Sequence, residues 1–419
     1  MIELLTILRR VFVLLVAVFL LMVGNGPLTT IISVRLGAAG HSPALIGIVM
    51  SAYFAGLMLG SLFAYRVVNG YGHIRAFTAF ASALSATALI YALHLAPLPW
   101  GALRFVEGFC MAGLFICVES WLNDSATAQT RGKVLALYMV FLYSGQAVGQ
   151  FMLNFHDASG LLLFMLISIL VSVAVIPVAL ARVSPPILPH VEGLSFRRLY
   201  QVSPLGIVGT ISSGLVLGSF YSLAPVFTGQ IGLDLSQTAL FMSAVIFGGV
   251  VLQLPIGRLS DVFDRRTVIV CTLAAIALIS AGTIVAVQFG SGVVYLAALV
   301  FGGFSFALYP LCVAHTNDHV RPEERVSASG GLILAYSAGA TLGPLFSSAI
   351  MTGTGPAGLF AFTGGLSGMT LLFGLWRMRV RPSPPAEQQG SYQPLPRTTP
   401  VSVPLDPRTL SQSADDARE

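Results

Sequence analysis

Long apolar stretches follow one another along almost the whole chain, separated by short groups of charged and turn-forming residues. Each stretch is long enough, at about 1.5 Å per helical residue, to cross a hydrocarbon layer of about 30 Å. The period-2 alternation that marks the strands of a membrane barrel is absent from the sequence. The pattern therefore predicts an all-α integral membrane protein with twelve transmembrane helices. The expected spans lie near residues 11–34, 43–65, 75–95, 99–122, 133–156, 160–181, 204–228, 236–259, 266–288, 291–314, 327–352 and 356–377.

The composition supports a membrane protein. Of 419 residues, 55% are hydrophobic and 9% are charged, against roughly 25% charged in an average soluble domain. The mean hydropathy is +0.84, and a soluble chain of this size would need far more polar surface. Disordered and disulfide-rich secreted classes are excluded by the same values. The four cysteines lie inside apolar runs and form no C-x-x-C pair, so neither a metal nor a cofactor is expected.

The positive charges are distributed unevenly between the two ends of the spans. The net charge is +5, and the arginines gather in short clusters between apolar runs. If the spans alternate in direction, nearly all these clusters fall on one side, and Arg35 lies in a connection on the other. The positive-inside rule places that side and both termini in the cytoplasm, and it requires an even number of spans. No arginine-rich stripe with interleaved aromatic residues is present, so a nucleic-acid partner is not expected.

The chain contains an internal repeat. A polar stretch at residues 184–202 divides the spans six and six. One constant shift brings Asn123 onto Asn317, Asp124 onto Asp318 and Arg131 onto Arg325. Internal repeats are common in transporters, whose substrate site lies between the repeats near mid-membrane. The expected organisation is an N-terminal six-helix half at 1–181, a central cytoplasmic loop at 182–203, a pseudo-symmetric C-terminal half at 204–378 and, from its Pro/Ser-rich composition, a disordered cytoplasmic tail at 379–419.

Several motifs resemble those of the major facilitator superfamily (MFS). The stretch 257–266 reads GRLSDVFDRR and closely resembles the cytoplasmic signature of that family. Arg104, Gly108 and Ala112 resemble its Arg-x-x-x-Gly motif, and the glycine-rich stretches at 144–149 and 339–344 resemble its fifth- and eleventh-helix signature. The stretches ESWLN at 119–123 and LYPL at 308–311 are similar to a bacterial branch whose members mostly lack assigned substrates. The resemblance covers residues 1 to about 378.

The resemblance implies the MFS fold and a secondary active transporter of the bacterial inner membrane that works by alternating access. Few charges lie within the spans, so we expect a small, weakly charged or amphipathic solute, with efflux slightly favoured over uptake. Expected partners are this solute, the lipid bilayer and, if transport is coupled, protons; the protein is expected to be a monomer. An alternative is a transporter-like receptor or sensor without net flux. Enzyme activity is not expected, because H-E-x-x-H, G-x-S-x-G and P-loop motifs are absent.

The first-half copy of the cytoplasmic signature departs from the family pattern. Residues 60–75 read GSLFAYRVVNGYGHIR, with Ala64 or Tyr65 in place of the expected acid. Either Asp261 acts alone, or Asp124 or Glu119 substitutes for the missing acid. Glu119 is a candidate latch toward Arg131, Arg66 or Arg75, and the alternative is an ordinary interfacial acid. The expected cytoplasmic gate comprises Glu119, Asp124, Arg131, Gly257, Asp261, Arg265, Arg266, Asp318 and Arg325.

Two ionisable residues lie inside the fourth span, where such groups are costly and are functional candidates by default. Arg104 and Glu107 are three residues apart and share one helix face. Glu107 is a candidate proton carrier whose protonation would free Arg104 for an anionic group. The alternative is a self-neutralising pair that lets Arg104 lie near the interface.

Uncharged polar residues within the spans are candidates for contacting the solute. Asn25 lies in a Gly-Asn-Gly-Pro stretch that should loosen the first span, and Gln146 and Gln150 share a face of the fifth. The alternative is hydrogen bonding between helices, at about 0.6 kcal/mol each. The pathway candidates are Arg104, Glu107, Asn25, Gln146, Gln150, Gln253 and Tyr309. Tyr53, Tyr221 and Tyr336 are weaker candidates for the same cavity.

Overall fold

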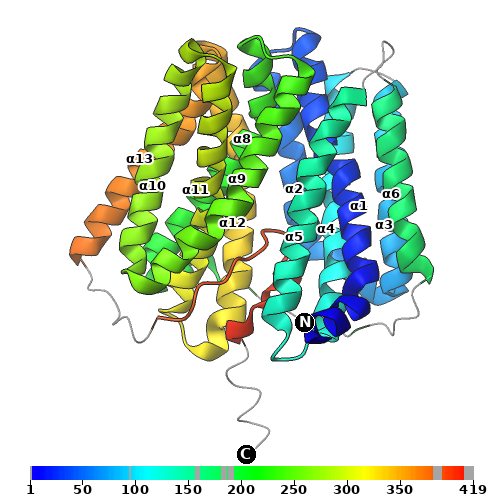
Figure 1. The fold of residues 1–419 in the computed structure, drawn as a ribbon, viewed down its shortest axis with the longest axis vertical. Helices are drawn as coiled ribbons and strands as arrows, with labels where there is room; N and C mark the ends of the chain where they lie inside the picture. Colours follow the sequence, from blue (N-terminus) through cyan, green and yellow to red (C-terminus); the bar gives the residue numbers. More distant parts are fainter. Residues whose placement is uncertain are drawn as a thin grey trace, which may run out of the picture.

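The protein is a bundle of long helices, shown as a ribbon in Figure 1. The computed structural model describes residues 2–93, 96–155, 161–180, 186, 193–380 and 389–409. Within these ranges, twelve helices are long and apolar enough to cross a membrane. The all-α membrane fold expected from the sequence is therefore confirmed, and this is a multi-pass membrane protein.

The helices fall into two groups of six along the chain. The first group is α1 (Ile2–Ala38), α2 (Pro43–Tyr71), α3 (His73–Leu93), α4 (Pro97–Ser125), α5 (Arg131–Gln150), which continues into the 3-10 turn η1 (Phe151–Phe155), and α6 (Leu162–Leu180). The short helix α7 (Phe196–Val202) lies within the expected central loop. The second group is α8 (Pro204–Gln230), α9 (Leu235–Val262), α10 (Arg265–Ala286), α11 (Ser291–Asn317), α12 (Arg325–Thr354) and α13 (Ala357–Val380).

Local sequence signals set where the helices begin and end. At the start of α2, Pro43 follows the N-cap Ser42, whose side chain accepts a hydrogen bond from the Leu45 amide. At its end, Gly72 adopts a φ of 85°, a conformation that glycine reaches without steric cost. At α9, Asp234 and Gln237 form a reciprocal capping box.

A closely packed helix pair occurs at the same relative position in each half. Gly108 of α4 faces the Tyr53 carbonyl of α2, and Gly302 of α11 faces the Val245 carbonyl of α9. A Cβ atom at either glycine would overlap that backbone. The two glycines that the internal repeat aligns therefore make the same contact in the two halves.

The direction of the helices defines two ends of the bundle. The helix α1 begins at the end where α13 finishes and where the C-terminal segment lies (Figure 1), and we call this end the terminal face. At the opposite face the halves are joined through hydroxyl groups. Ser33 of α1 donates to the Ser222 carbonyl of α8 at 2.7 Å, and Ser51 of α2 donates to the Thr341 carbonyl of α12 at 2.5 Å.

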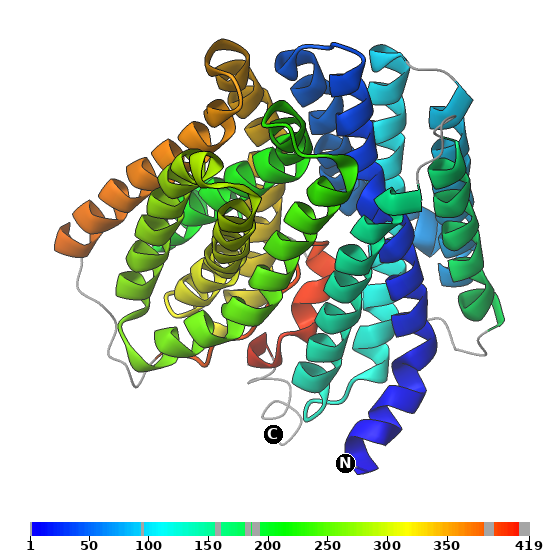
Figure 2. The same cartoon turned by 45° about the horizontal axis from the view of Figure 1, so that its top comes forward.

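Residues 389–409, which we call the C-terminal segment, lie between the two halves at the terminal face (Figure 2). They include the 3-10 helix η5 (Pro400–Leu405), and Tyr392, Leu395 and Leu405 are buried. The structure differs here from the disorder expected for 379–419, and residues 381–388 and 410–419 lie outside the described residues. The physical reason is that side chains of both halves hydrogen-bond to the backbone of the segment, which a composition rule does not detect.

Candidate functional site

A cavity of about 130 Å³ lies between the two halves. The expected candidates Asn25, Gln146 and Gln150 line it from α1 and α5, and Tyr221 and Tyr336 line it from α8 and α12. Both halves therefore contribute to the wall, and residues of the C-terminal segment complete it.

Some polar side chains of the cavity wall already have hydrogen-bond partners within the protein, and others do not. Gln150 donates to the Gly26 carbonyl at 2.9 Å and accepts from the Thr30 hydroxyl at 2.9 Å, so it joins α5 to α1. The side-chain amide oxygen of Asn25, Oδ1, is buried without a hydrogen-bond partner among the described residues. A buried acceptor without a partner is costly. Asn25 therefore has an acceptor open to a further hydrogen bond, whereas Gln150 is used between α5 and α1.

Arg104 and Glu107 form a fully buried ion pair on α4, in the geometry that their spacing predicts. The Arg104 guanidinium lies 2.8 Å from the Glu107 carboxylate, and the Tyr91 hydroxyl donates to that carboxylate at 3.2 Å. Arg104 also donates to the Thr29 hydroxyl at 3.0 Å and lies 4.3 Å from the centre of the Tyr53 ring. Because Thr29 and Tyr53 line the cavity, the pair lies directly behind its wall.

Two other pathway candidates lie beside the C-terminal segment. Tyr309 packs against Tyr336 with ring centres 5.3 Å apart, and it borders a small void of about 10 Å³ together with Leu395. Gln253 of α9 is buried and faces the Tyr392 hydroxyl. The structure therefore places Tyr309 and Gln253 between the cavity and the terminal face.

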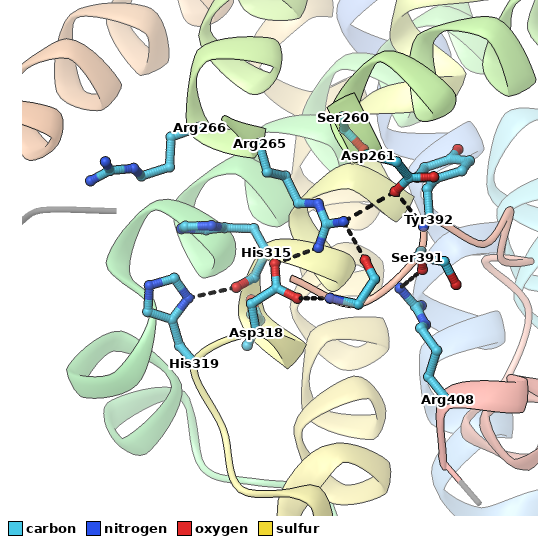
Figure 3. A network of polar contacts seen from close by, with 12 residues as sticks. Ser260, Asp261, Arg265, Arg266, His315, Asp318, His319, Ser391, Tyr392 and Arg408 are labelled. Carbon is cyan, nitrogen blue, oxygen red and sulfur yellow. Dashed lines mark hydrogen bonds and ion pairs between the residues drawn. The ribbon is translucent and has the colours of Figure 1, made fainter. Parts of the chain in front are cut away.

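The expected gate residues of the second half bind the start of the C-terminal segment, as Figure 3 shows. Arg265 forms a short ion pair with Asp318 and donates to the Gly390 carbonyl at 2.5 Å. Its distance to Asp261 is 3.4 Å. The Gly390 amide donates to Asp318 at 3.0 Å, and the Tyr392 amide donates to Asp261 at 2.7 Å. Both carboxylates therefore connect Arg265 to the backbone of the segment.

The electrostatics of this cluster depend on burial. Desolvation raises the pKa of Asp318 above its ordinary value, and the Arg265 guanidinium opposes that rise. Arg325 donates to the Arg408 carbonyl at 3.2 Å, at the far end of the segment. Arg408 in turn pairs with Asp406 at 2.6 Å. The second half thus holds the segment near both of its ends.

The remaining expected gate residues differ in their surroundings. Gly257 of α9 lies against the Tyr392 ring, with no room for a Cβ atom between them. Arg266 pairs with Asp264 at 3.2 Å. Asp124 is exposed. Gly257 therefore contacts the C-terminal segment through Tyr392.

Glu119 of α4 is fully buried and bound to hydroxyl groups. It accepts from the Tyr138 hydroxyl at 2.9 Å and makes short hydrogen bonds with the Thr398 and Thr399 hydroxyls. The expected latch between Glu119 and Arg131 is not among the ion pairs of the described residues. Glu119 therefore bonds to the C-terminal segment in this structure.

Two further residues of the first half bind the backbone of η5. The Asn123 side-chain amide donates to the Val401 carbonyl at 2.6 Å, and Arg131 donates to the Pro404 carbonyl at 2.6 Å. Arg131 and Arg325 are related by the internal repeat, so an equivalent arginine of each half donates to a backbone carbonyl of the segment. The C-terminal segment thus connects expected gate residues of one half to expected gate residues of the other.

Arg397 of the C-terminal segment was not identified from the sequence. Its guanidinium carbon lies 4.3 Å from the centre of the Phe306 ring, 5.8 Å from that of Tyr336 and 6.0 Å from that of Tyr143. It donates to the Tyr143 hydroxyl at 2.9 Å and lines the central cavity. In the sequence, Arg397 is one of several arginines in a polar tail, and no local pattern distinguishes it from the others.

Comparisons with known proteins agree with this architecture. The family model described as "Major Facilitator Superfamily" matches residues 14–242 and 206–408. An uncharacterized MFS-type transporter of Enterobacter sp. (strain 638) is 28% identical over 385 residues, covering 90% of this chain and 98% of the relative. The uncharacterized MFS-type transporter YcaD of Shigella flexneri is 29% identical with the same coverage. A crystal structure of the nucleoside transporter NupG has the same fold, with a TM-score of 0.72 at 14% identity over 88% of this chain and 99% of NupG.

Proposed function

The chain belongs to the major facilitator superfamily, and on this premise we propose that it is a secondary active transporter working by alternating access at the central cavity. The observation that carries the proposal is a cavity walled by both halves. It lies between the hydroxyl contacts of the opposite face and the C-terminal segment that connects the halves at the terminal face. Rocking of one half against the other would exchange the face to which this cavity opens.

The cavity wall supports a small solute with apolar surface and few charges. Met22, Phe54 and Leu142 provide apolar surface, and Asn25 and Gln146 provide polar groups. The described side chains that line the cavity are uncharged, apart from Arg397 of the C-terminal segment. An amphipathic solute satisfies both kinds of surface.

Coupling to protons is proposed through Glu107. Protonation of Glu107 would weaken its bonds to Arg104, and Arg104 already donates to Thr29 of the cavity wall. The state of the carboxylate would therefore reach the solute site through one side chain. The alternative role, a pair that only neutralises Arg104, predicts no movement of protons with the solute.

We place the terminal face, with both termini, in the cytoplasm of a bacterial cell. The helix ends and connections at this face carry Arg66, Arg75, Arg131, Arg265 and Arg321. An excess of arginine and lysine in short loops marks the cytoplasmic side of membrane proteins.

A sensor without net flux is the second candidate. The observation that favours it is the placement of Arg397 and Thr398 in the cavity wall, because a bound ligand would then contact the C-terminal segment directly. In that case a ligand would move the segment while the two halves kept their positions.

Two distances measured in the full chain in lipid nanodiscs separate these functions. Spin labels at Ala39 and Gln230 report the α1–α8 contact at the opposite face, and labels at Gln129 and Arg321 report the terminal face; all four residues are exposed. Transport predicts two populations in which one distance lengthens as the other shortens, together with solute flux in proteoliposomes under a proton gradient. Fixed distances and no flux, with ligand-induced release of the segment, would support the sensor and overturn the transporter.

A further inference from the structure

Three aromatic side chains surround the guanidinium of Arg397, and we call them the aromatic cage: Tyr143, Phe306 and Tyr336. They come from both halves, since Tyr143 lies on α5 and the other two lie on α11 and α12. Each is at least nine-tenths buried. The Tyr143 and Phe306 rings also contact each other, with centres 5.4 Å apart.

The cage has the chemistry of a cation site. The faces of aromatic rings carry negative charge density and attract guanidinium and ammonium groups within about 6 Å, most strongly where water is excluded. All three ring centres lie within this range of the Arg397 guanidinium. An arginine side chain stays protonated in proteins, so the cage holds a full positive charge.

A buried acid contacts the residue next to Arg397. Glu119 is bonded to Thr398, the residue that follows Arg397, and no basic side chain pairs with it in the part of the chain that the structure describes. The segment therefore places the caged cation one residue from a threonine that binds a buried carboxyl group.

Arg397 leaves part of the site unused. One of its terminal nitrogens, Nη1, is buried without a hydrogen-bond partner among the described residues. The central cavity of about 130 Å³ adjoins the same side chain. A free ligand with a cationic group in the cage would therefore have room for an apolar body in the cavity.

We infer that the aromatic cage is a binding site for the cationic group of an amphipathic organic cation, a guanidinium or ammonium compound, and that Arg397 occupies it as a tethered competitor. This inference rests on the proposed function and names its substrate class. The C-terminal segment is bound on both sides of Arg397, at Gly390 and at Pro404. A solute entering from the terminal face must therefore displace the segment.

Two probes of matched shape test the charge requirement: benzylguanidinium and its neutral analogue benzylurea. Their dissociation constants are measured on the full chain in nanodiscs for wild type, Arg397→Gln and Arg397→Lys. Glutamine removes the charge, and lysine keeps it. We expect Arg397→Gln to bind benzylguanidinium about tenfold more tightly than wild type, the scale of one desolvated cation–π contact. Arg397→Lys should show a smaller gain, and benzylurea should show none.

Replacement of Phe306 by leucine in the Arg397→Gln chain should abolish the gain, because leucine fills space without a π face. Equal binding of the two probes, an affinity unchanged by Arg397→Gln, no binding of benzylguanidinium to that variant, or a gain that survives Phe306→Leu would overturn the inference. A second measurement needs no added ligand. A fluorophore on the C-terminal segment should report a docked segment in Arg397→Lys and a released one in Arg397→Gln, and equal docking would show a structural anchor only.

The spin-label distances separate this inference from the proposed function. If one spin-label distance lengthens as the other shortens but the cage shows no preference for the cation, the substrate class is wrong and alternating access stands. If the cage prefers the cation but the distances stay fixed under a proton gradient, the cation site stands and transport is wrong.

Discussion

The backbone of Gly257 lies directly against the aromatic ring of Tyr392. This contact joins the first residue of the MFS-like motif, on α9, to a segment more than a hundred residues further along the chain. Tyr392 is 6% exposed, and its amide is held by Asp261, one helical turn beyond Gly257. In this structure the glycine of the motif therefore acts as a docking surface for the C-terminal segment.

Replacement of Gly257 by valine should release the segment. The added side chain overlaps the Tyr392 ring, and such overpacking costs about 1–3 kcal/mol, which corresponds to about tenfold or more in the population of released segment. The measurement is the rate of tryptic cleavage after Arg397, detected by mass spectrometry, since cleavage of a transiently opened site follows its population. Gly70→Val is the control, because that glycine faces open space at the same face. Unchanged protection in Gly257→Val would show that Tyr392 does not hold the segment.

Glu119→Gln should also loosen the segment, through a different contact. The carboxylate is bound by three hydroxyl groups, and hydrogen bonds to a charged acceptor contribute about 1.5–3 kcal/mol against about 1 kcal/mol for neutral groups. We expect cleavage after Arg397 to rise by about tenfold. The variant with valine at both Thr398 and Thr399 removes the other side of the same contacts. If the free-energy changes of Glu119→Gln and of the double valine variant simply add when the substitutions are combined, Glu119 does not hold the segment through these hydroxyl groups.

Arg265→Gln should destabilise the protein and the docked segment more than Arg325→Gln does. Arg265 is buried, pairs with Asp318 and binds the Gly390 carbonyl, whereas Arg325 makes a single 3.2 Å bond to the Arg408 carbonyl. Loss of Arg265 leaves Asp318 buried without its cation, which typically costs about 3–5 kcal/mol. Loss of Arg325 removes about 1 kcal/mol. The free energy of unfolding and the docking of the segment check the order, and a larger effect from Arg325→Gln would contradict the assignment.

Glu107→Gln should lower stability and, if the proposed coupling is correct, abolish solute-dependent proton movement in proteoliposomes. The substitution leaves the fully buried Arg104 without its carboxylate, at about 3 kcal/mol or more. The control is the variant Arg104→Met with Glu107→Leu, in which both charges are replaced by apolar groups of similar volume and stability should be nearly restored. Proton movement that persists in Glu107→Gln would remove the coupling role and leave the pair as a structural element.

Features that depend on one helix at a time were predictable from the sequence. Span positions follow from apolar length, and the Arg104–Glu107 pair follows from the i, i+3 spacing that places both side chains on one face. The cavity positions of Asn25, Gln146 and Gln150 follow from polar groups within apolar helices. In each case the physical signal lies within a single helix.

The docking of the C-terminal segment was not predictable, because its contacts connect residues far apart in sequence and often end on backbone carbonyls. Asn123, Arg131 and Arg265 all donate to main-chain oxygens of the segment, and any residue type supplies such an acceptor. A composition rich in proline and serine then reads as disorder. The aromatic cage was missed for a related reason, since Tyr143 and Phe306 lie on helices of different halves.

The seam between the halves at the opposite face contains no ion pair among the described residues, and hydroxyl-to-carbonyl bonds such as Ser33 to Ser222 and Ser51 to Thr341 connect it. When such a bond opens, the serine can turn back onto a carbonyl of its own helix, or a water molecule can replace the partner. Opening that seam therefore exposes no uncompensated charge and needs no counter-ion. The terminal face must separate charged groups from a bound segment before it opens. The two ends of the bundle should consequently differ in their response to salt, with the rate of opening rising with ionic strength at the terminal face and staying constant at the other.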